Sequence, residues 1–341
     1  MDLRQLGEFG LIDRIQKWFP PPAATVPLGI GDDAAAIRTD PRQYLLLTTD
    51  SQIEGVHFDL SFSSLQQVGY KSVMVNVSDI AAMGGTPRYL LISLGLTDRQ
   101  SVREVDQLYR GIRKASREAG LDLLGGNIAA TPGPFFLSPT LVGEVPKKEM
   151  VTRSGAREGD AIYVTGTLGE AAAGLALLKK GIEERRFTRL LGRHRTPQAR
   201  WKEGRLLAQE RIASAMIDLS DGLAADLRHL TDQSGVGAEL EAHLLPLSAR
   251  LKEVALQLGA DPLEYGLAGG EDYELLFSVP IRKIKRLEAL INGGLIQARR
   301  IGWTRSRRLG LKLKDSQGRT RPLAAGGWDH LRRNGGNSGW D

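Results

Sequence analysis

The chain has 341 residues, of which 41% are hydrophobic and 25% charged, so it is globular in composition and too long for one compact core; we expect two domains. It contains 40 glycines, which favours a loop-rich α/β enzyme, and no cysteine, which excludes disulfides, thiolate nucleophiles and cysteine zinc sites. The formal charge is +6, but aromatic residues are only 6% and do not interleave with the basic stretches, which argues against nucleic acid as a partner.

The first half of the chain alternates between predicted helices and strands. Residues 1–19 mix acids and bases among apolar positions, which predicts a short amphipathic helix and not a signal peptide. No apolar run approaches the ~20 residues of a membrane helix, so we expect a soluble, cytoplasmic protein without a membrane partner. Residues 44–49 and 88–96 read as buried strands, residues 65–83 and 101–119 as helices, and LDLLGG as a return to the sheet.

The polar stretch at residues 146–160 is the best candidate for a domain junction. We therefore predict an N-terminal domain at 1–146, a C-terminal domain at 147–331 and a flexible polar tail at 332–341. After the junction come the strand AIYVT, the helix EAAAGLALLKKG, the helix DGLAADLRHL, and GGEDYELLFSV as a turn leading into a strand. Much of the basic excess follows at 282–321, where a solvated face is the preferred interpretation.

Acidic residues recur where apolar segments end in turns of small residues. They are Asp32 and Asp33 in GIGDDAAAI, Asp50 in LLLTTDS, Asp79 in VNVSDIAAM, and Asp218 and Asp221 in IDLSDGL. A carboxylate in such a place is usually a helix cap or a turn residue, and for Asp221 alone that interpretation and a functional one carry equal weight.

Asp79 resists the structural interpretation. It falls in the last turn of the apolar helix predicted at 65–83, where the helix dipole disfavours negative charge by roughly 0.3–1 kcal/mol. Apolar neighbours such as Val75, Val77 and Ile80 imply partial burial, which adds a desolvation cost. A bound cation would offset both penalties.

Asp50 ends a predicted strand, and ligand sites in α/β sheets lie at the carboxyl ends of strands. Several carboxylates converging there, beside the hydroxyls of Thr48, Thr49 and Ser220, would provide the hard oxygen ligands that Mg²⁺ prefers. GIGDDA also fits a dinucleotide-binding pattern, but its aspartates would repel a pyrophosphate unless metal ions lie between. The P-loop and protein-kinase signatures are absent, so any nucleotide site has another architecture.

Taken in order, these segments resemble the thiamine-monophosphate kinase family over residues 7–331. The motifs that carry the resemblance are GEFGLI, GIGDDAA, TTDSQIEGVHF, GYKSVMVNVSDIAAMGGTP, LLGGN, TRSGAREGDAIYVTGTLG, IDLSDGLAADL, LAGGEDYELLF and GGWDHL. The resemblance implies the α/β two-domain fold of the aminoimidazole-ribotide synthetase superfamily. In that fold the N-terminal sheet-and-helix domain pairs in a homodimer, with ATP in a cleft between the subunits.

The resemblance also implies a set of site residues. Many family members have aspartate where this chain has Asn127, and the amide should weaken metal affinity there. The implied residues are Asp33, Thr48, Thr49, Asp50, Asp79, Asp218 and Asp221 for several Mg²⁺ ions; Tyr109, Gly126, Asn127, Arg153 and Ser220 for the nucleotide; and His57, Glu271 and Trp328 for thiamine monophosphate.

Without the resemblance, the residues outside the aspartate set have ordinary structural interpretations. His57 would be a turn or surface histidine, and Trp328 and Tyr109 would be packing residues. Glu271 could shape a turn after two glycines, and Arg153 could be an exposed residue of the basic junction.

The implied reaction is direct, magnesium-dependent transfer of the ATP γ-phosphate to thiamine monophosphate, giving thiamine diphosphate and ADP. The acceptor is already an ionised phosphate, so no general base is expected, and the sequence has no obvious Ser-His or His-carboxylate pair. Two alternatives remain: another ATP-dependent enzyme of the same superfamily, or a non-catalytic, metal-dependent nucleotide-binding protein.

Overall fold

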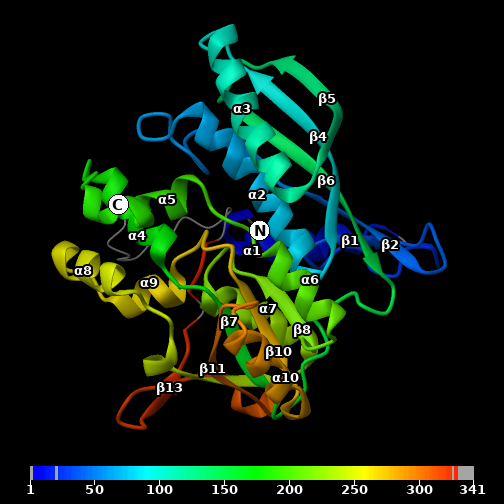
Figure 1. Ribbon diagram of the computed structural model, residues 1–341, viewed down its shortest axis with the longest axis vertical. Coiled ribbons are helices and arrows are strands. Elements are labelled where there is room, and N and C mark those ends of the chain that lie inside the picture. The colour runs from blue at the N-terminus through cyan, green and yellow to red at the C-terminus, as the bar shows by residue number, and fades with distance from the viewer. Residues whose placement is uncertain (1–2, 20–21, 325, 329–341) are drawn as a thin grey trace.

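The computed structural model describes residues 3–19, 22–324 and 326–328, which form two β-sheets flanked by helices (Figure 1). The first sheet has the order β1-β2-β6-β4-β5, and β3 also pairs with β6. All its pairs are antiparallel except β4 with β5. Its strands are β1 (Ala35–Ile37), β2 (Gln43–Thr49), β3 (Gln52–Ile53), β4 (Thr86–Leu96), β5 (Asp122–Ala130) and β6 (Phe136–Pro146).

The helices of this half are α1 (Leu3–Gln16), α2 (Leu65–Ala82) and α3 (Val102–Ala119). Ser64 begins α2 and Ser101 begins α3 with a capping box, in which the serine hydroxyl and a side chain three residues later satisfy backbone N–H groups. α2 and α3 approach closely because Gly69 faces the Leu108 carbonyl, where a Cβ atom would come within 2.1 Å of the oxygen. A larger residue at 69 would push the two helices apart.

The second sheet has the order β13-β12-β9-β11-β7-β10-β8, and only β9 and β12 are parallel. Its strands are β7 (Ala161–Thr165), β8 (Ala215–Asp218), β9 (Gly237–Glu241), β10 (Leu275–Val279), β11 (Ala298–Arg305), β12 (Leu311–Lys314) and β13 (Thr320–Pro322). The α-helices here are α4 (Glu170–Lys179), α5 (Thr188–Arg195), α6 (Trp201–Gln209), α7 (Leu223–Ser234), α8 (Ala249–Leu258), α9 (Pro262–Ala268) and α10 (Ile281–Asn292); the 3₁₀ turns are η1 (Arg185–Phe187), η2 (Ala242–Leu244) and η3 (Arg307–Leu309).

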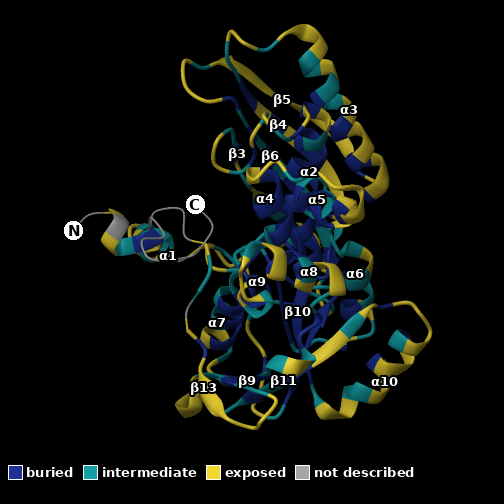
Figure 2. Ribbon diagram, turned by 90° about the vertical axis from the view of Figure 1, so that its left-hand side faces the viewer, coloured by how far each residue is buried: buried dark blue, intermediate teal, exposed yellow. Residues whose placement is uncertain are grey.

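Helix α2 lies at the centre of the molecule. It packs against β2, β4 and β6 of the first sheet and also contacts α6 and β8 of the second half. Figure 2 shows its residues as almost entirely buried, whereas β5 is exposed along its length. Because α2 contacts both halves of the molecule, its side chains can link residues that are far apart in the sequence.

The predicted α/β architecture with two sheets is confirmed. The helix predicted at 65–83 is α2, and the strands predicted at 44–49, 88–96 and 161–165 are β2, β4 and β7 with small shifts at their ends. α1 forms as predicted but is interrupted at Gly7, whose φ is 72°. The domain boundary at 146/147 stays a prediction, and the tail at 332–341 lies outside the described residues. None of the described helices combines the length and apolarity needed to cross a membrane.

Candidate functional site

Three carboxylates from distant parts of the chain meet between the two sheets. Asp33 lies in the loop before β1, Asp79 in the last turn of α2, and Asp218 at the end of β8. Each offers an oxygen atom, and these oxygens lie within 4.8 Å of one another. Three carboxylates at this spacing repel one another strongly unless protons or cations lie between them.

Among the described residues, each of these carboxylates has a polar partner. Thr48 Oγ1 donates a 2.5 Å hydrogen bond to Asp79 Oδ2. Ser78 Oγ donates a 2.7 Å hydrogen bond to Asp218 Oδ2. The Arg153 guanidinium lies with Nη2 2.7 Å from Asp33 Oδ1. The second oxygen of Asp33, Oδ2, is buried and has no hydrogen-bond partner among the described residues.

The electrostatics of the cluster favour a bound cation. Burial raises the pKa of Asp79 well above its usual value, and the charges of Asp50, Asp218 and Asp33 raise it further. The pKa of Asp218 is also raised, first by burial and then by Asp33. An orphaned buried oxygen beside two other carboxylates fits a small divalent cation with oxygen ligands, which is the chemistry of Mg²⁺.

Asp50 joins the cluster through its charge and its backbone. Its carboxylate raises the pKa values of both Asp79 and Asp218, so it belongs to the same electrostatic site. Its backbone N–H donates to Oδ1 of Asn76, a fully buried residue of α2, at 3.2 Å. Asn76 thereby fixes the end of β2 against the helix that carries Asp79.

Thr48 and Thr49 point to opposite faces of β2, because side chains alternate along a strand. Thr48 contacts Asp79, but Thr49 Oγ1 donates to the Pro139 carbonyl at 2.9 Å and lies 3.2 Å from the Thr140 hydroxyl. The structure therefore brings Thr48, and not the Thr49 hydroxyl, next to the three carboxylates. A metal-binding role for Thr49 stays a prediction.

The nucleotide residues predicted in the first half lie on β5 and α3. Gly126 has no room for a side chain, since a Cβ atom would approach the Ile92 carbonyl oxygen to 1.9 Å. Asn127 pairs with Ser93 of β4, which pairs with Ser138 of β6. Two strand spacings, about 10 Å, therefore separate Asn127 from Ser138, whose hydroxyl is bonded to the Asp50 carbonyl.

Tyr109 lies on α3, where it packs against the core of the first sheet. Burial raises the pKa of its hydroxyl. Tyr109 thus has the packing role that its position in the sequence indicates without the family resemblance. Its predicted nucleotide contact stays a prediction.

Ser220 and Asp221 occupy the loop between β8 and α7. Asp226 holds this loop, because its Oδ2 accepts hydrogen bonds from the N–H groups of Asp221 and Gly222. The Ser220 carbonyl accepts a 2.7 Å hydrogen bond from the Glu271 N–H. The loop that carries Glu271 therefore lies against the loop that follows Asp218.

Glu271 has an unusual backbone and two charged or polar partners. Its φ of 67° lies in the left-handed region, which is rare for a residue other than glycine. Its Oε1 is 2.5 Å from Lys71 Nζ of α2, and its Oε2 is 2.8 Å from His194 Nδ1 of α5. Burial alone would raise the pKa of Glu271, but Lys71 and His194 hold it below its usual range.

His57 and Trp328 lie in two further loops, which contact Lys71 and Asp221 respectively. His57 Nδ1 accepts a hydrogen bond from the Ile53 N–H, so the neutral ring carries its proton on Nε2. The Trp328 N–H donates to the Asp221 carbonyl at 3.1 Å, and Trp328 is 47% exposed. Trp328 is therefore not a core residue, and its predicted contact with thiamine monophosphate stays a prediction.

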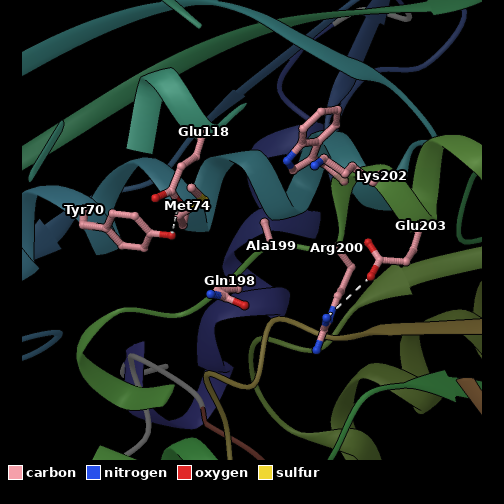
Figure 3. A pocket seen from close by; sticks show the side chains of 9 residues that line it. Tyr70, Met74, Glu118, Gln198, Ala199, Arg200, Lys202 and Glu203 are labelled. Carbon is pink, nitrogen blue, oxygen red and sulfur yellow. Dashed lines mark hydrogen bonds and ion pairs between the residues drawn. The ribbon is translucent and has the colours of Figure 1, made fainter. Parts of the chain in front are cut away.

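A cavity of about 450 Å³ lies elsewhere, against the face of α2 that carries Tyr70 and Met74 (Figure 3). Tyr70 donates a 2.7 Å hydrogen bond to Glu118 on one side, and Arg200 and Glu203 pair on the other. None of the predicted site residues lines this cavity. It is a feature separate from the carboxylate cluster.

Sequence reasoning missed several polar residues that shape the site. Ser78 and Asn76 are fully buried in α2, and Lys71 is 3% exposed. The signal was present, because polar residues in an apolar helix such as VMVNVSDI need a buried partner. No such sequence signal marked His194 or Asp226. The partner of His194, Glu271, is distant in the sequence, and Asp226 accepts from backbone N–H groups of a turn.

Comparison with known proteins adds independent information. Residues 31–145 match the family described as AIR synthase related protein, N-terminal domain, and residues 157–314 match AIR synthase related protein, C-terminal domain. The thiamine-monophosphate kinase of Aquifex aeolicus is 43% identical over 82% of this chain and 88% of its own length. That of Bacillus subtilis is 35% identical over 75% of this chain and 78% of its own length.

A solved structure of AaThiL complexed with AMPPCP and TMP matches with a TM-score of 0.84 and 38% identity, covering 97% of this chain and 99% of that one. The similarity thus extends over both sheets and the loops that carry the carboxylates. On these grounds the chain belongs to the thiamine-monophosphate kinase family, within the proteins related to AIR synthase.

Proposed function

We propose that this protein transfers the γ-phosphate of ATP to thiamine monophosphate in the presence of Mg²⁺, producing thiamine diphosphate and ADP. The observation that carries the proposal is the meeting of Asp33, Asp79 and Asp218 in a chain of this family. Support comes also from the AaThiL complex, which holds AMPPCP, an analogue of ATP, together with TMP. A location in the cytoplasm, which the cysteine-free sequence suits, belongs to the same proposal.

In this proposal the carboxylate cluster holds several magnesium ions. Asp33, Asp79 and Asp218 are the central ligands, with Thr48 and Asp50 beside them. Mg²⁺ supplies the positive charge that lets two polyanions approach and that stabilises the transferring phosphoryl group. The role of the chain is to hold its ligands in place before substrate binds, which Asn76 and Ser78 do through hydrogen bonds.

The acceptor residues lie along the boundary between the two halves. The Nε2–H of His57 is a suitable donor to a phosphate oxygen. Glu271 and Trp328 would offer a carboxylate and an aromatic face to the positively charged thiazolium ring. Asp221, Ser220, Arg153, Tyr109, Gly126 and Asn127 keep the nucleotide and metal roles predicted for them. Since the acceptor phosphate is already ionised, we propose direct transfer without a general base or a phosphoenzyme.

The test is a product assay with the purified chain, ATP, Mg²⁺ and thiamine monophosphate. We expect stoichiometric thiamine diphosphate and ADP, and no product when EDTA replaces Mg²⁺. Free thiamine serves as the control acceptor, and it should give no thiamine diphosphate. A folded protein that binds ATP but forms no thiamine diphosphate would refute the proposal.

We also propose that the protein forms a homodimer through the first sheet. Strand β5 is an edge strand with all nine residues exposed, and edge strands of this kind pair or aggregate unless they are covered. Several apolar side chains on β4 and β5 are exposed and could contact a second copy. They are Tyr89, Leu91, Leu123, Leu124 and Ile128.

A further inference from the structure

Helix α2 carries a buried cation that the predicted chemistry does not use. Lys71 is 3% exposed, and an ammonium group in such a place is costly unless it is paired. Its Nζ has two partners on different segments: Glu271 Oε1 at 2.5 Å and the His57 carbonyl oxygen at 3.1 Å. Both segments carry a residue that the proposed function assigns to thiamine monophosphate.

The same face of α2 also reaches the metal end of the site. Ser78 follows Lys71 by seven residues, almost two full turns, so the two side chains lie on one stripe of the helix. Lys71 contacts Glu271, and Ser78 donates to Asp218, so both bonds cross from the first half of the molecule to the second. About 10 Å of rigid helix therefore separates the acceptor-side contact from the metal-side contact.

Glu271 is held from three directions. Lys71 contacts one carboxylate oxygen and His194 the other, while the Ser220 carbonyl accepts the backbone N–H. His194 is 4% exposed and Lys71 3%, so both partners of the carboxylate are buried, whereas the Glu271 side chain itself is 26% exposed. A left-handed backbone conformation at Glu271 persists only where the surroundings determine it, as these contacts do.

We propose that Lys71 is a positioning residue for the thiamine phosphate: its ammonium group fixes the His57 turn and the Glu271 carboxylate at a set distance from the magnesium-binding carboxylates. The inference rests on the proposed function, because His57 and Glu271 have their acceptor role only there. Lys71 itself need not touch either substrate. Removing its charge leaves the partly buried Glu271 without this cation and releases the His57 turn from α2.

The test compares Lys71→Met, Lys71→Gln and Lys71→Arg in steady-state kinetics, with each substrate varied at saturating levels of the other. For Lys71→Met we expect KM for thiamine monophosphate to rise on the order of tenfold or more, while KM for ATP changes by less than about twofold. Lys71→Arg, which keeps the positive charge, should recover most of the loss. If Lys71→Met does not fold, Lys71→Gln carries the test, since its amide is polar but uncharged and removes the ammonium group from Glu271.

Arg200→Met is the matched control. Arg200 contacts Glu274, a fully buried carboxylate, through Nε and Nη2 at 2.6 Å each. We expect this variant to lower Tm without a selective effect on either KM. Equal rises in both KM values for Lys71→Met, or unchanged values in a folded variant, would overturn the positioning role.

The wild-type protein separates this inference from the proposed function. If it forms no thiamine diphosphate and does not bind thiamine monophosphate in calorimetry, both proposals fail. If it turns over normally and the Lys71 variants keep its KM for thiamine monophosphate, only the positioning role fails.

Discussion

Ser78 of α2 donates a 2.7 Å hydrogen bond to Asp218 at the end of β8, across 140 residues of sequence. Both residues are buried, so the bond forms only when the second sheet docks on α2. Asp218 comes within reach of Asp33 and Asp79 through the same docking. Formation of the proposed metal site and association of the two halves are therefore one event.

Because the three carboxylates crowd together, we expect Asp79→Asn to stabilise the ligand-free protein but to weaken its binding of Mg²⁺ and nucleotide. In EDTA, we expect Tm to rise by a few degrees, a gain of about 1 kcal/mol in the free energy of unfolding, because one of three mutually repelling carboxylates is gone. The stabilisation that Mg²⁺ with a non-hydrolysable ATP analogue gives the wild type should be lost. Thermal unfolding with and without these ligands measures both effects.

Asp160→Asn is the control for that experiment. Asp160 is 6% exposed and accepts a 2.7 Å hydrogen bond from Ser214, but it lies outside the three-carboxylate cluster. Its substitution should leave the ligand-induced rise in Tm intact. A full ligand-induced rise in Asp79→Asn would remove Asp79 from the site.

The geometry at His57 predicts a selective effect on the acceptor. His57→Ala removes the Nε2–H donor, and KM for thiamine monophosphate should rise about tenfold, with KM for ATP changed less than about twofold. His243→Ala is a control, because the His243 side chain is 52% exposed on η2. Equal effects of His57→Ala on both substrates would contradict its assignment to the acceptor.

His229 predicts a loss of stability in mild acid. Burial, and next the charge of Arg153, lower the pKa of His229 from 6.5 to about 4 in the folded protein, where its ring lies against Phe9 at a tilt, with centroids 4.0 Å apart. Between these two pKa values only the unfolded chain gains the proton, so this contribution to stability is present above pH 6.5 and falls as the pH decreases toward 4.

Allowing for the partial exposure of His229, the loss between pH 7 and pH 5 should be about 1 kcal/mol. Urea unfolding at these two pH values measures it, and His229→Gln should lose less stability than the wild type over the same interval. If the wild type and His229→Gln lose the same amount, His229 does not contribute to the acid sensitivity.

The exposed side chains on β4 and β5 predict that a charge there blocks dimer formation. Leu91→Glu should reduce the mass measured by light scattering from twice the chain mass of 37.2 kDa to the chain mass itself. Leu256→Glu, at an 84% exposed position on α8, should leave the mass unchanged. A dimeric Leu91→Glu would place the interface elsewhere.

Much of the local structure could be predicted because its signals lie close together in the chain. α2 follows from helical spacing of apolar residues after Ser64, and the glycines at 84 and 85 end it. β7 follows from a short apolar run, and its residues are all buried in the centre of the second sheet. The pairing of strands could not be predicted. In the second sheet β10 lies between β7 and β8, although both of these strands come much earlier in the chain.

The site shows the same division. The sequence by itself determined that carboxylates stand at the ends of apolar segments, and for Asp79 it also determined the need for a counter-charge. Only the tertiary structure decided that Asp33, Asp79 and Asp218 meet, that Thr48 faces them and Thr49 does not, and that Lys71 pairs with Glu271. The physical reason is that capping and periodicity act within a few residues, whereas Coulomb and hydrogen-bond energies depend on distances that the docking of the two sheets sets.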